Sequence, residues 1–494
     1  MNTFKRIVVV VVGAVMLVGS SASAKKLARP KLVVGIAVDQ MRWDYLYRYY
    51  NDYGDNGFKR LIDEGYSCDN TMINYIPSTT ANGHTSIWTG SVPAISGIDG
   101  NNFYVNGKFR YCTSDETVKG VGTTSHDGQM SPRNEVVSTI GDELKIATEF
   151  QSKVIGIALK DRAAILPAGH AADGAFWLDS KTAKFVSSTY YMDKLPRWVE
   201  KYNKSFNASY DSISMTPLGI DLTERMAEAA IEAEQLGVHE NTDLLCVSFS
   251  STDKLAHAIG GHNPRIKAMY LDLDNRLADL LTYLDKKIGK GQYLVFLTAD
   301  HGGANNVEFL NKHRIPGGNF SDSDIKKGLE NALQQHFGKT DKFVDRIFDC
   351  KVQFQHENIA SMGLTMEEVK KFAIDYLKKS TDFAYIVDMD NLGAATVPSL
   401  IREKIINGYN RLRGGDIQMI PQTQYYSDYV GKDGTTHFAW NPYDAHIPFL
   451  LMGWGVPHGK TVRETHITDI APTICSLINI QMPSGCVGNA VELK

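Results

Sequence analysis

The sequence predicts an α/β protein whose mainly parallel central sheet is flanked by helices and carries an inserted α+β subdomain. Apolar runs that do not alternate with polar residues are typical of strands covered on both faces. Four such runs occur, at residues 31–38, 153–159, 243–249 and 293–298. Amphipathic patterns typical of helices lie between them, at 221–236 and 263–287. Strands that alternate with helices in this way favour a parallel sheet wrapped by helices.

The hydrophobic pattern of the sequence changes at residues 321–429, which we predict to form an inserted subdomain. Short strand-like pieces separate three amphipathic stretches there, at 322–337, 365–377 and 398–410. We expect the core to comprise residues 25–320 and 430–494 and to resume in the apolar run Ile447 to Met452. A smaller excursion, residues 103–132, is rich in Gly, Ser and Thr, and we expect it near the entrance of a site.

The first 24 residues have the pattern of a secretory signal peptide. Lys5 and Arg6 precede a short apolar run at 7–18, and Ala22 and Ala24 frame a small-residue cleavage site. The run is too short to span a membrane. The sequence therefore predicts a periplasmic or secreted protein with no membrane attachment after cleavage.

Composition narrows the class of protein further. The chain has 494 residues, of which 43% are hydrophobic and 22% charged, as in folded globular proteins. Without Lys5 and Arg6 the 52 basic residues become 50 against 56 acidic ones, a net charge of -6 that argues against nucleic acid as a partner. Export permits disulfides, and proximity in sequence suggests Cys475 with Cys486 and Cys68 with Cys112. Cys246 lies inside an apolar run and reads as a buried thiol. We expect a monomer.

Carboxylates follow three of the apolar runs. Asp39, Asp253 and Asp300 each lie at or just after the end of a predicted strand, where open α/β sheets build their sites. His257 lies four residues after Asp253, on the same face if this segment is helical, and His301 follows Asp300 directly. Carboxylate and imidazole together suit Zn²⁺.

Each pair also has a simpler interpretation. Asp253 and His257 are compatible with an ion pair on a solvated helix, and Asp300 with His301 is compatible with a turn that ends a strand. Their joint occurrence favours metal binding, because a hydrophobic core has no use for such residues. His446, immediately before the run at 447–452, offers a third imidazole.

Hydroxyl and cationic side chains supply the remaining chemistry. Ser78, Thr79 and Thr80 lie where a polar turn meets a helical pattern, so one of them is a helix cap or a nucleophile, and composition does not separate them. Lys160 and Arg162 lie at the end of an extended run, point to the same side if the strand continues, and could clamp phosphate oxygens. The alternative for this pair is a charged strand edge.

A polar amide, Asn101, lies between Thr80 and Lys160 in the sequence. Asn101, directly after Gly100, could donate to the same anion as Lys160 and Arg162, although Asn after Gly is most often a turn.

These segments resemble the alkaline phosphatase superfamily, and within it the threonine-nucleophile, phosphate-irrepressible bacterial branch. The similarity spans nearly the whole mature chain. It rests on VDQMRWD around Asp39, PSTTANGHTSIWTGSVPAISGIDGNN, LKDR around Lys160, STDKLAH, TADHGG and YDAHIP.

The resemblance implies a hydrolase of small-molecule phosphate monoesters that works by double displacement through a phosphothreonine intermediate at a two-Zn²⁺ site. It implies Thr80 as the nucleophile, because the family places this residue four positions before the histidine of the motif, here His84. Asn101, Lys160 and Arg162 match the groups that contact the phosphoryl oxygens.

The resemblance also implies which residues hold the metal. One Zn²⁺ would be bound by Asp253, His257 and His446, and the other by Asp39, Asp300 and His301 with Thr80. His262 and His437 lie close in sequence to these ligands, and either is an alternative as a ligand or as a supporting residue.

Two other functions remain open. A phosphodiesterase or nucleotide pyrophosphatase uses the same scaffold, but such relatives usually lack the Lys160 and Arg162 pair. A non-catalytic phosphate-binding relative is less favoured because the nucleophile and every expected ligand are present. A sulfatase would need a C/S-x-P-x-R context, which does not occur near Thr80.

Overall fold

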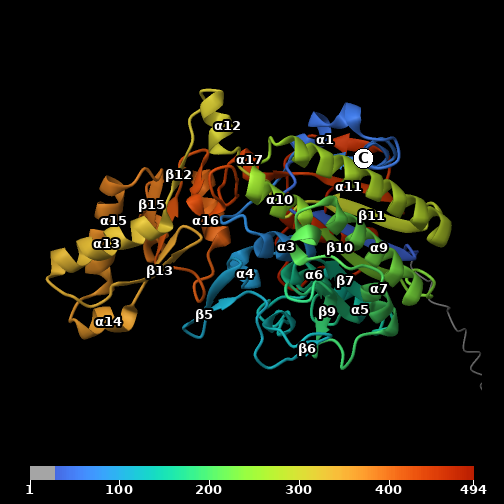
Figure 1. The fold of residues 1–494 in the computed structure, drawn as a ribbon, viewed down its shortest axis with the longest axis horizontal. Helices are drawn as coiled ribbons and strands as arrows, with labels where there is room; N and C mark the ends of the chain where they lie inside the picture. The colour runs from blue at the N-terminus through green and yellow to red at the C-terminus, as the bar shows by residue number, and fades with distance from the viewer. Residues whose placement is uncertain (1–27) are drawn as a thin grey trace, which may run out of the picture.

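The computed structural model describes residues 28–494 and shows a large α/β core beside a smaller lobe (Figure 1). The predicted signal peptide, residues 1–24, lies outside the described residues. A ten-stranded sheet forms the centre of the core. In sheet order its strands are β20 (Gly459–Thr461), β2 (Tyr66–Cys68), β19 (Phe449–Gly453), β11 (Tyr293–Thr298), β1 (Leu32–Val38), β10 (Asp243–Phe249), β7 (Val154–Ala158), β8 (Gly174–Leu178), β9 (Phe185–Ser188) and β6 (Gly120–Val121).

The five central strands, from β11 to β8, run parallel, so their carboxyl ends meet along one edge of the sheet. The strands predicted at 243–249 and 293–298 are confirmed to the residue as β10 and β11. All residues of β1, β7, β10 and β11 are buried, which is why their sequences show no polar alternation. The predicted fold class is confirmed, with β19 added antiparallel beside β11.

Helices flank this sheet in two groups (Figure 1). Helices α9 and α11 pack against each other and α9 against β10, whereas α3 packs on α6, and α6 on β7 and β8. Gly35 in β1 and Gly156 in β7 let α3 and α6 approach closely, because a Cβ at either position would lie 2.2 Å from an atom of the facing helix. The bounds are α3 (Thr80–Thr89), α6 (Asp161–Ala168), α9 (Pro217–Ala233) and α11 (Pro264–Leu284).

The smaller lobe is an α+β unit with its own hydrophobic cluster, which includes Leu329, Val352 and Ile417. Its four-stranded sheet has the antiparallel order β13-β14-β16-β15. The helix predicted at 322–337 is confirmed to the residue. The elements are α13 (Asp322–Phe337), β13 (Val344–Phe348), β14 (Lys351–Phe354), α14 (His356–Ser361), α15 (Met366–Ser380), β15 (Tyr385–Asp388), α16 (Ser399–Gly408) and β16 (Ile417–Ile420).

Two short strands tie the lobe to the core where the chain enters and leaves it. β12 (Gly318–Phe320) pairs in parallel with β17 (Tyr425–Ser427). The excursion at 103–132 contains the hairpin β4 (Asn102–Val105) and β5 (Lys108–Tyr111) together with β6. Within residues 28–494 we find no helix that is both long and apolar enough to cross a membrane.

The suggested disulfides are wrong. All six cysteines, each within the described residues, are unpaired. Cys68 lies in β2, whereas Cys112 packs with Phe103 and Leu166 in a separate cluster, so proximity in sequence did not bring them together. Cys246 is a buried thiol inside β10, as predicted.

Candidate functional site

The acidic residues converge where the central strands end. Asp39 directly follows β1, and Asp300 with His301 follows β11. Asp253 lies in α10 (Ser251–Ile259), the helix that follows β10. All four side chains are buried, and a cluster of carboxylates in the interior requires compensating positive charge.

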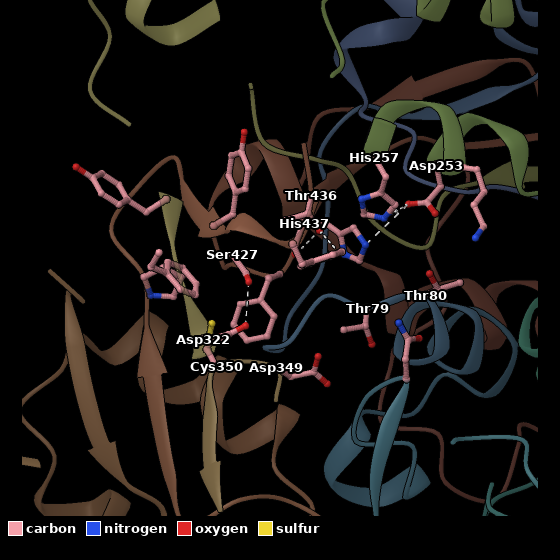
Figure 2. Close-up of a pocket in the computed structure, with 18 of the residues that line it drawn as sticks. Thr79, Thr80, Asp253, His257, Asp322, Asp349, Cys350, Ser427, Thr436 and His437 are labelled. Carbon is pink, nitrogen blue, oxygen red and sulfur yellow. Dashed lines mark hydrogen bonds and ion pairs between the residues drawn. The ribbon is translucent and has the colours of Figure 1, made fainter. Parts of the chain in front are cut away.

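A first group combines Asp253 with two imidazoles (Figure 2). His257 lies one helical turn after Asp253, with Nε2 3.0 Å from Asp253 Oδ1. His437 approaches the same oxygen from the other side, with Nε2 at 3.9 Å. One ligand atom from each residue lies within 4.8 Å of the others, a spacing that suits a single metal ion.

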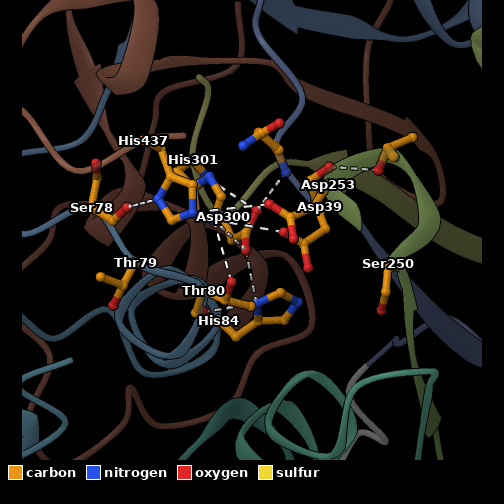
Figure 3. Close-up of polar contacts among 12 residues, drawn as sticks. Asp39, Ser78, Thr79, Thr80, His84, Ser250, Asp253, Asp300, His301 and His437 are labelled. Atoms are coloured by element: carbon orange, nitrogen blue, oxygen red, sulfur yellow. Dashed lines mark hydrogen bonds and ion pairs between the residues drawn. The ribbon is translucent and has the colours of Figure 1, made fainter. Parts of the chain in front are cut away.

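A second group lies beside the first and contains Asp39, Asp253 and His301, whose ligand atoms also fall within 4.8 Å of one another (Figure 3). His301 Nε2 is 3.6 Å from Asp39 Oδ1 and 3.2 Å from Asp300 Oδ2. Asp300 is oriented through its other oxygen, which accepts from the backbone N–H of Gln40 at 3.1 Å.

The donor set fits divalent zinc. Asp39 Oδ1, Asp253 Oδ1 and Asp300 Oδ2 are buried and have no hydrogen-bond partner among the described residues. Backbone hydrogen bonds fix the orientation of the three imidazole rings. Nδ1 of each ring donates to a carbonyl oxygen: His257 to Thr435, His301 to Gly302, and His437 to Ser78. Such bonds leave each Nε2 with a lone pair for a metal. Burial and the adjacent His301 and His257 hold the pKa of His437 well below its usual range, which keeps that ring neutral.

The pKa values of the carboxylates are shifted in opposite directions. Burial and the like charges of Asp253 and Asp300 raise the pKa of Asp39 well above its usual range. Burial also opposes ionisation of Asp253, but His257 and Lys160 outweigh it and hold the pKa of Asp253 well below its usual range. Lys160 is the only lysine that the structure pairs with these carboxylates in residues 28–494, so three buried acids face a single ammonium group.

His446 does not belong to this cluster, and this corrects the predicted ligand set. It begins β18 (His446–Ile447), its ring stacks on Trp43 with centroids 4.5 Å apart, and its Nε2 lies 2.9 Å from the carbonyl oxygen of Asp69. His437 occupies the place for which His446 was proposed. His262, the other alternative, stacks on Phe309 away from both groups.

Two neighbouring threonines begin α3 and differ in what they contact. Thr80 is the first helical residue, and its Oγ1 lies 3.4 Å from His301 Nε2. The Thr79 hydroxyl instead donates to Asn82 Oδ1 at 3.1 Å. The Thr80 hydroxyl therefore faces the buried carboxylate and imidazole cluster at the positive end of a helix.

Lys160, Arg162 and Asn101 line the same cavity as Thr80. Lys160 Nζ lies 2.5 Å from both Asp39 Oδ2 and Asp253 Oδ2. Arg162 Nη1 donates to the Tyr111 hydroxyl at 2.8 Å. The backbone N–H of Ala81 donates to Asn101 Oδ1 at 3.0 Å, so the other end of the amide, the N–H₂ group, is the one that could donate to an anion.

Lys160 and Arg162 lie at the start of a helix, not at the end of a strand as predicted. The strand ends at Ala158, Lys160 is the N-cap of α6, and Arg162 lies in the first helical turn. Both side chains nevertheless line one cavity of about 250 Å³, together with Thr80, Asn101 and the zinc-ligand candidates His257 and His437 (Figure 2).

Known proteins match the chain over almost its whole length. The model of the family described as type I phosphodiesterase / nucleotide pyrophosphatase matches residues 33–444. This chain belongs to that family.

Several individual proteins are similar in sequence to this chain. It is 44% identical to the alkaline phosphatase PafA of Elizabethkingia meningoseptica, with 97% of each chain covered. It is 45% identical to a protein of Myroides odoratus named calcium-transporting ATPase, with 95% of each covered. The crystal structure of wild-type PafA superposes with a TM-score of 0.91 at 45% identity, covering 94% of this chain and 99% of that one.

A second PafA structure carries four substitutions, at a threonine and an asparagine 21 positions apart and at a lysine and an arginine two positions apart. In this chain Thr80 and Asn101 are likewise 21 positions apart, and Lys160 and Arg162 are two positions apart. The residue types agree as well.

Sequence reasoning did not assign two supporting residues. His84, four residues after Thr80 on the same helix, places Nδ1 3.3 Å from Asp300 Oδ2 and Nε2 2.8 Å from Ser248 Oγ. Tyr111, in the 103–132 excursion, links Arg162 to Asp161 by donating to Oδ1 of the latter at 2.8 Å. Helical spacing from Thr80 is a signal for His84, whereas nothing local in the sequence marks Tyr111.

Proposed function

We propose that this chain hydrolyses phosphate monoesters at a two-zinc site through a phosphothreonine intermediate on Thr80. The observation that carries the proposal is the position of the Thr80 hydroxyl. It lies at a helix N-terminus, 3.4 Å from His301 in a buried carboxylate and imidazole cluster. The same cavity presents three groups suited to phosphoryl oxygens. Similarity to a relative named alkaline phosphatase supports the same activity.

The ligand candidates divide between two ions. Asp253, His257 and His437 would hold one, and Asp39, Asp300 and His301 would hold the other together with the Thr80 hydroxyl. Bound zinc would lower the pKa of the hydroxyl and stabilise the charge on the departing oxygen.

The protein's own groups position and stabilise the reacting phosphoryl group. Thr80 Oγ1 attacks phosphorus, the alcohol leaves, and water then cleaves the phosphothreonine ester to release phosphate. Arg162 supplies forked N–H donors, and Tyr111 holds it in place. Lys160 and the Asn101 amide would face the remaining oxygens. Preorganised donors of this kind stabilise a phosphoryl-transfer transition state by about 3 kcal/mol each.

The second candidate is diester or pyrophosphate hydrolysis, which the family match favours. The two reactions differ in the charge on phosphorus. A monoester dianion has two non-bridging charges to distribute among donors, whereas a diester has one. The cations Lys160 and Arg162, which line the same cavity as Thr80, therefore favour the monoester.

A substrate comparison tests the proposal. We expect zinc-loaded protein to cleave p-nitrophenyl phosphate at least about a hundredfold faster, in kcat/KM, than bis-p-nitrophenyl phosphate. Thr80→Ala should lose at least about a thousandfold of the monoester activity, whereas the matched control Thr79→Ala should retain most of it. A preference for the diester, or undiminished activity in Thr80→Ala, contradicts the proposal.

We further propose that the enzyme is periplasmic or secreted and that it acts as a monomer on small-molecule monoesters. The support is the pattern of residues 1–24 and the acidic net charge. The N-terminal sequence and solution mass of protein recovered from the natural host check both points.

A further inference from the structure

The second wall of the catalytic cavity belongs to the smaller lobe, and the proposed chemistry does not use it. Asp322, Asp349 and Tyr425 line this wall. Figure 2 shows the carboxylates of Asp322 and Asp349 on the side of the cavity away from His257. The alcohol part of a monoester bound at Thr80 extends away from phosphorus, so this wall is the surface that the alcohol meets.

Asp349 is held at the tip of the β13–β14 hairpin. Asp349 and Cys350 form its two-residue turn with φ of 46° and 49°, a conformation that glycine and asparagine adopt most easily. A strained turn of this kind persists only where its surroundings fix it. Here the Asp349 carboxylate lies against the loop before Asn101, because a Cβ added to Gly100 would be 2.3 Å from Asp349 Oδ2. The carboxylate is thereby held in one position against the Gly100 backbone, at the edge of the cavity.

Neither carboxylate of this wall forms an ion pair within residues 28–494. Lys351, two residues after Asp349, instead forms a buried ion pair with Asp99 and also donates to the Asp99 carbonyl at 3.1 Å. Asp322 Oδ2 accepts from Ser427 at 2.9 Å, but its Oδ1 is buried without a partner among the described residues. Burial raises the pKa of Asp349 to about 7, so its carboxylate is ionised at alkaline pH.

Aromatic rings complete the wall. Phe320 and Tyr425 line the cavity. Tyr429 also lines it, nearer to the candidate metal ligands, with its ring 6.1 Å from that of His257. Aromatic faces together with unneutralised carboxylates bind organic cations, and both disfavour a second anion. We infer that this wall is a subsite for the alcohol moiety and selects monoesters whose alcohol carries an ammonium group over neutral or anionic ones. The inference rests on the proposed monoesterase function and specifies its substrate class.

Three short alkyl phosphates of similar size test the inference: 2-aminoethyl, propyl and 2-carboxyethyl phosphate, assayed with the zinc-loaded full chain at about pH 8, above the pKa of Asp349. We expect kcat/KM for the aminoethyl ester to exceed that for the propyl ester by about tenfold, and the carboxyethyl ester to be the poorest substrate. Equal kcat/KM for all three overturns the inference alone. Absence of turnover with every monoester overturns the proposed function, and the inference with it.

Conservative variants assign the effect to the wall. Asp349→Asn and Asp322→Asn should each bring the aminoethyl-to-propyl ratio close to one while leaving kcat/KM for propyl phosphate within about twofold. Asparagine retains the shape of the side chain and tolerates the turn at 349. Asp324→Asn is the matched control, because Asp324 is exposed in the same first turn of α13 and does not line the cavity. An unchanged ratio in both wall variants, or an equal change in the control, overturns the inference.

Discussion

The imidazole rings of His301 and His437 lie nearly parallel, with centroids 3.4 Å apart. His301 belongs to the group with Asp39, and His437 to the group with Asp253 and His257. The Nδ1 atom of each ring donates to a backbone carbonyl, so the two Nε2 atoms are fixed toward the carboxylates. The two candidate metal sites are therefore adjacent, separated by this pair of stacked rings.

Zinc content distinguishes His437 from His446. We expect dialysed wild-type protein to retain about two zinc ions per chain, His437→Ala about one or fewer, and His446→Ala about two. His446→Ala should instead lower the melting temperature, because His446 stacks on Trp43 and contacts the Asp69 carbonyl. Elemental analysis decides the point. Loss of zinc in His446→Ala with full retention in His437→Ala would restore the original ligand set.

Arg162→Ala should reduce kcat/KM for a monoester by about a hundredfold and for a diester by much less. The physical reason is the extra negative charge that the guanidinium meets on a monoester. Parallel kinetics with p-nitrophenyl and bis-p-nitrophenyl phosphate measure both losses. Losses of equal size would show that Arg162 does not act as a monoester clamp.

Metal removal should destabilise the fold. Asp39, Asp253 and Asp300 are buried close together, and ions bound only to the folded state stabilise it by about 4 kcal/mol at a thousandfold excess over Kd. Chelation should lower the melting temperature by several degrees, and added zinc should restore it. A melting temperature that does not respond to chelation would show that these carboxylates hold no tightly bound ion.

The stability of the core should fall between about pH 6.5 and pH 9 because of His170. Burial opposes its charge, but a hydrogen bond to Asp142 and the charge of Glu135 outweigh burial and raise the pKa of His170 to about 9. A histidine whose folded pKa is raised stabilises the fold below its unfolded pKa and loses that contribution as pH rises through the folded value.

We therefore expect His170→Gln to lower stability by about 1 kcal/mol at pH 6, a value reduced by solvent screening of the partly exposed ring, and to have little effect near pH 10. Thermal melts of both proteins across this range measure the difference. A deficit that does not shrink with rising pH would contradict the assigned pKa.

The parallel core could be predicted because its strands are buried on both faces, which leaves unbroken apolar runs such as 243–249. The β13–β14 hairpin could not, since its turn places Asp349 and Cys350 at positive φ without the glycine or asparagine that marks such turns. That turn is fixed by packing against Gly100, far away in sequence.

The candidate site divides in the same way. Asp39, Asp253 and Asp300 were predictable because they follow strands whose ends meet. His437 was only an alternative because it lies in an irregular segment after the smaller lobe, and its position depends on a tertiary hydrogen bond to the Ser78 carbonyl. His446 begins a strand and does not follow one, and its ring stacks on Trp43.

Trapping the covalent intermediate tests the central claim most directly. Zinc-loaded protein mixed with excess monoester, quenched in acid during turnover and digested, should yield a phosphorylated peptide with the phosphate on Thr80. The same treatment of Thr80→Ala should yield none. Phosphate on a different residue, or wild-type turnover with no covalent phosphate at any time point, would contradict the account.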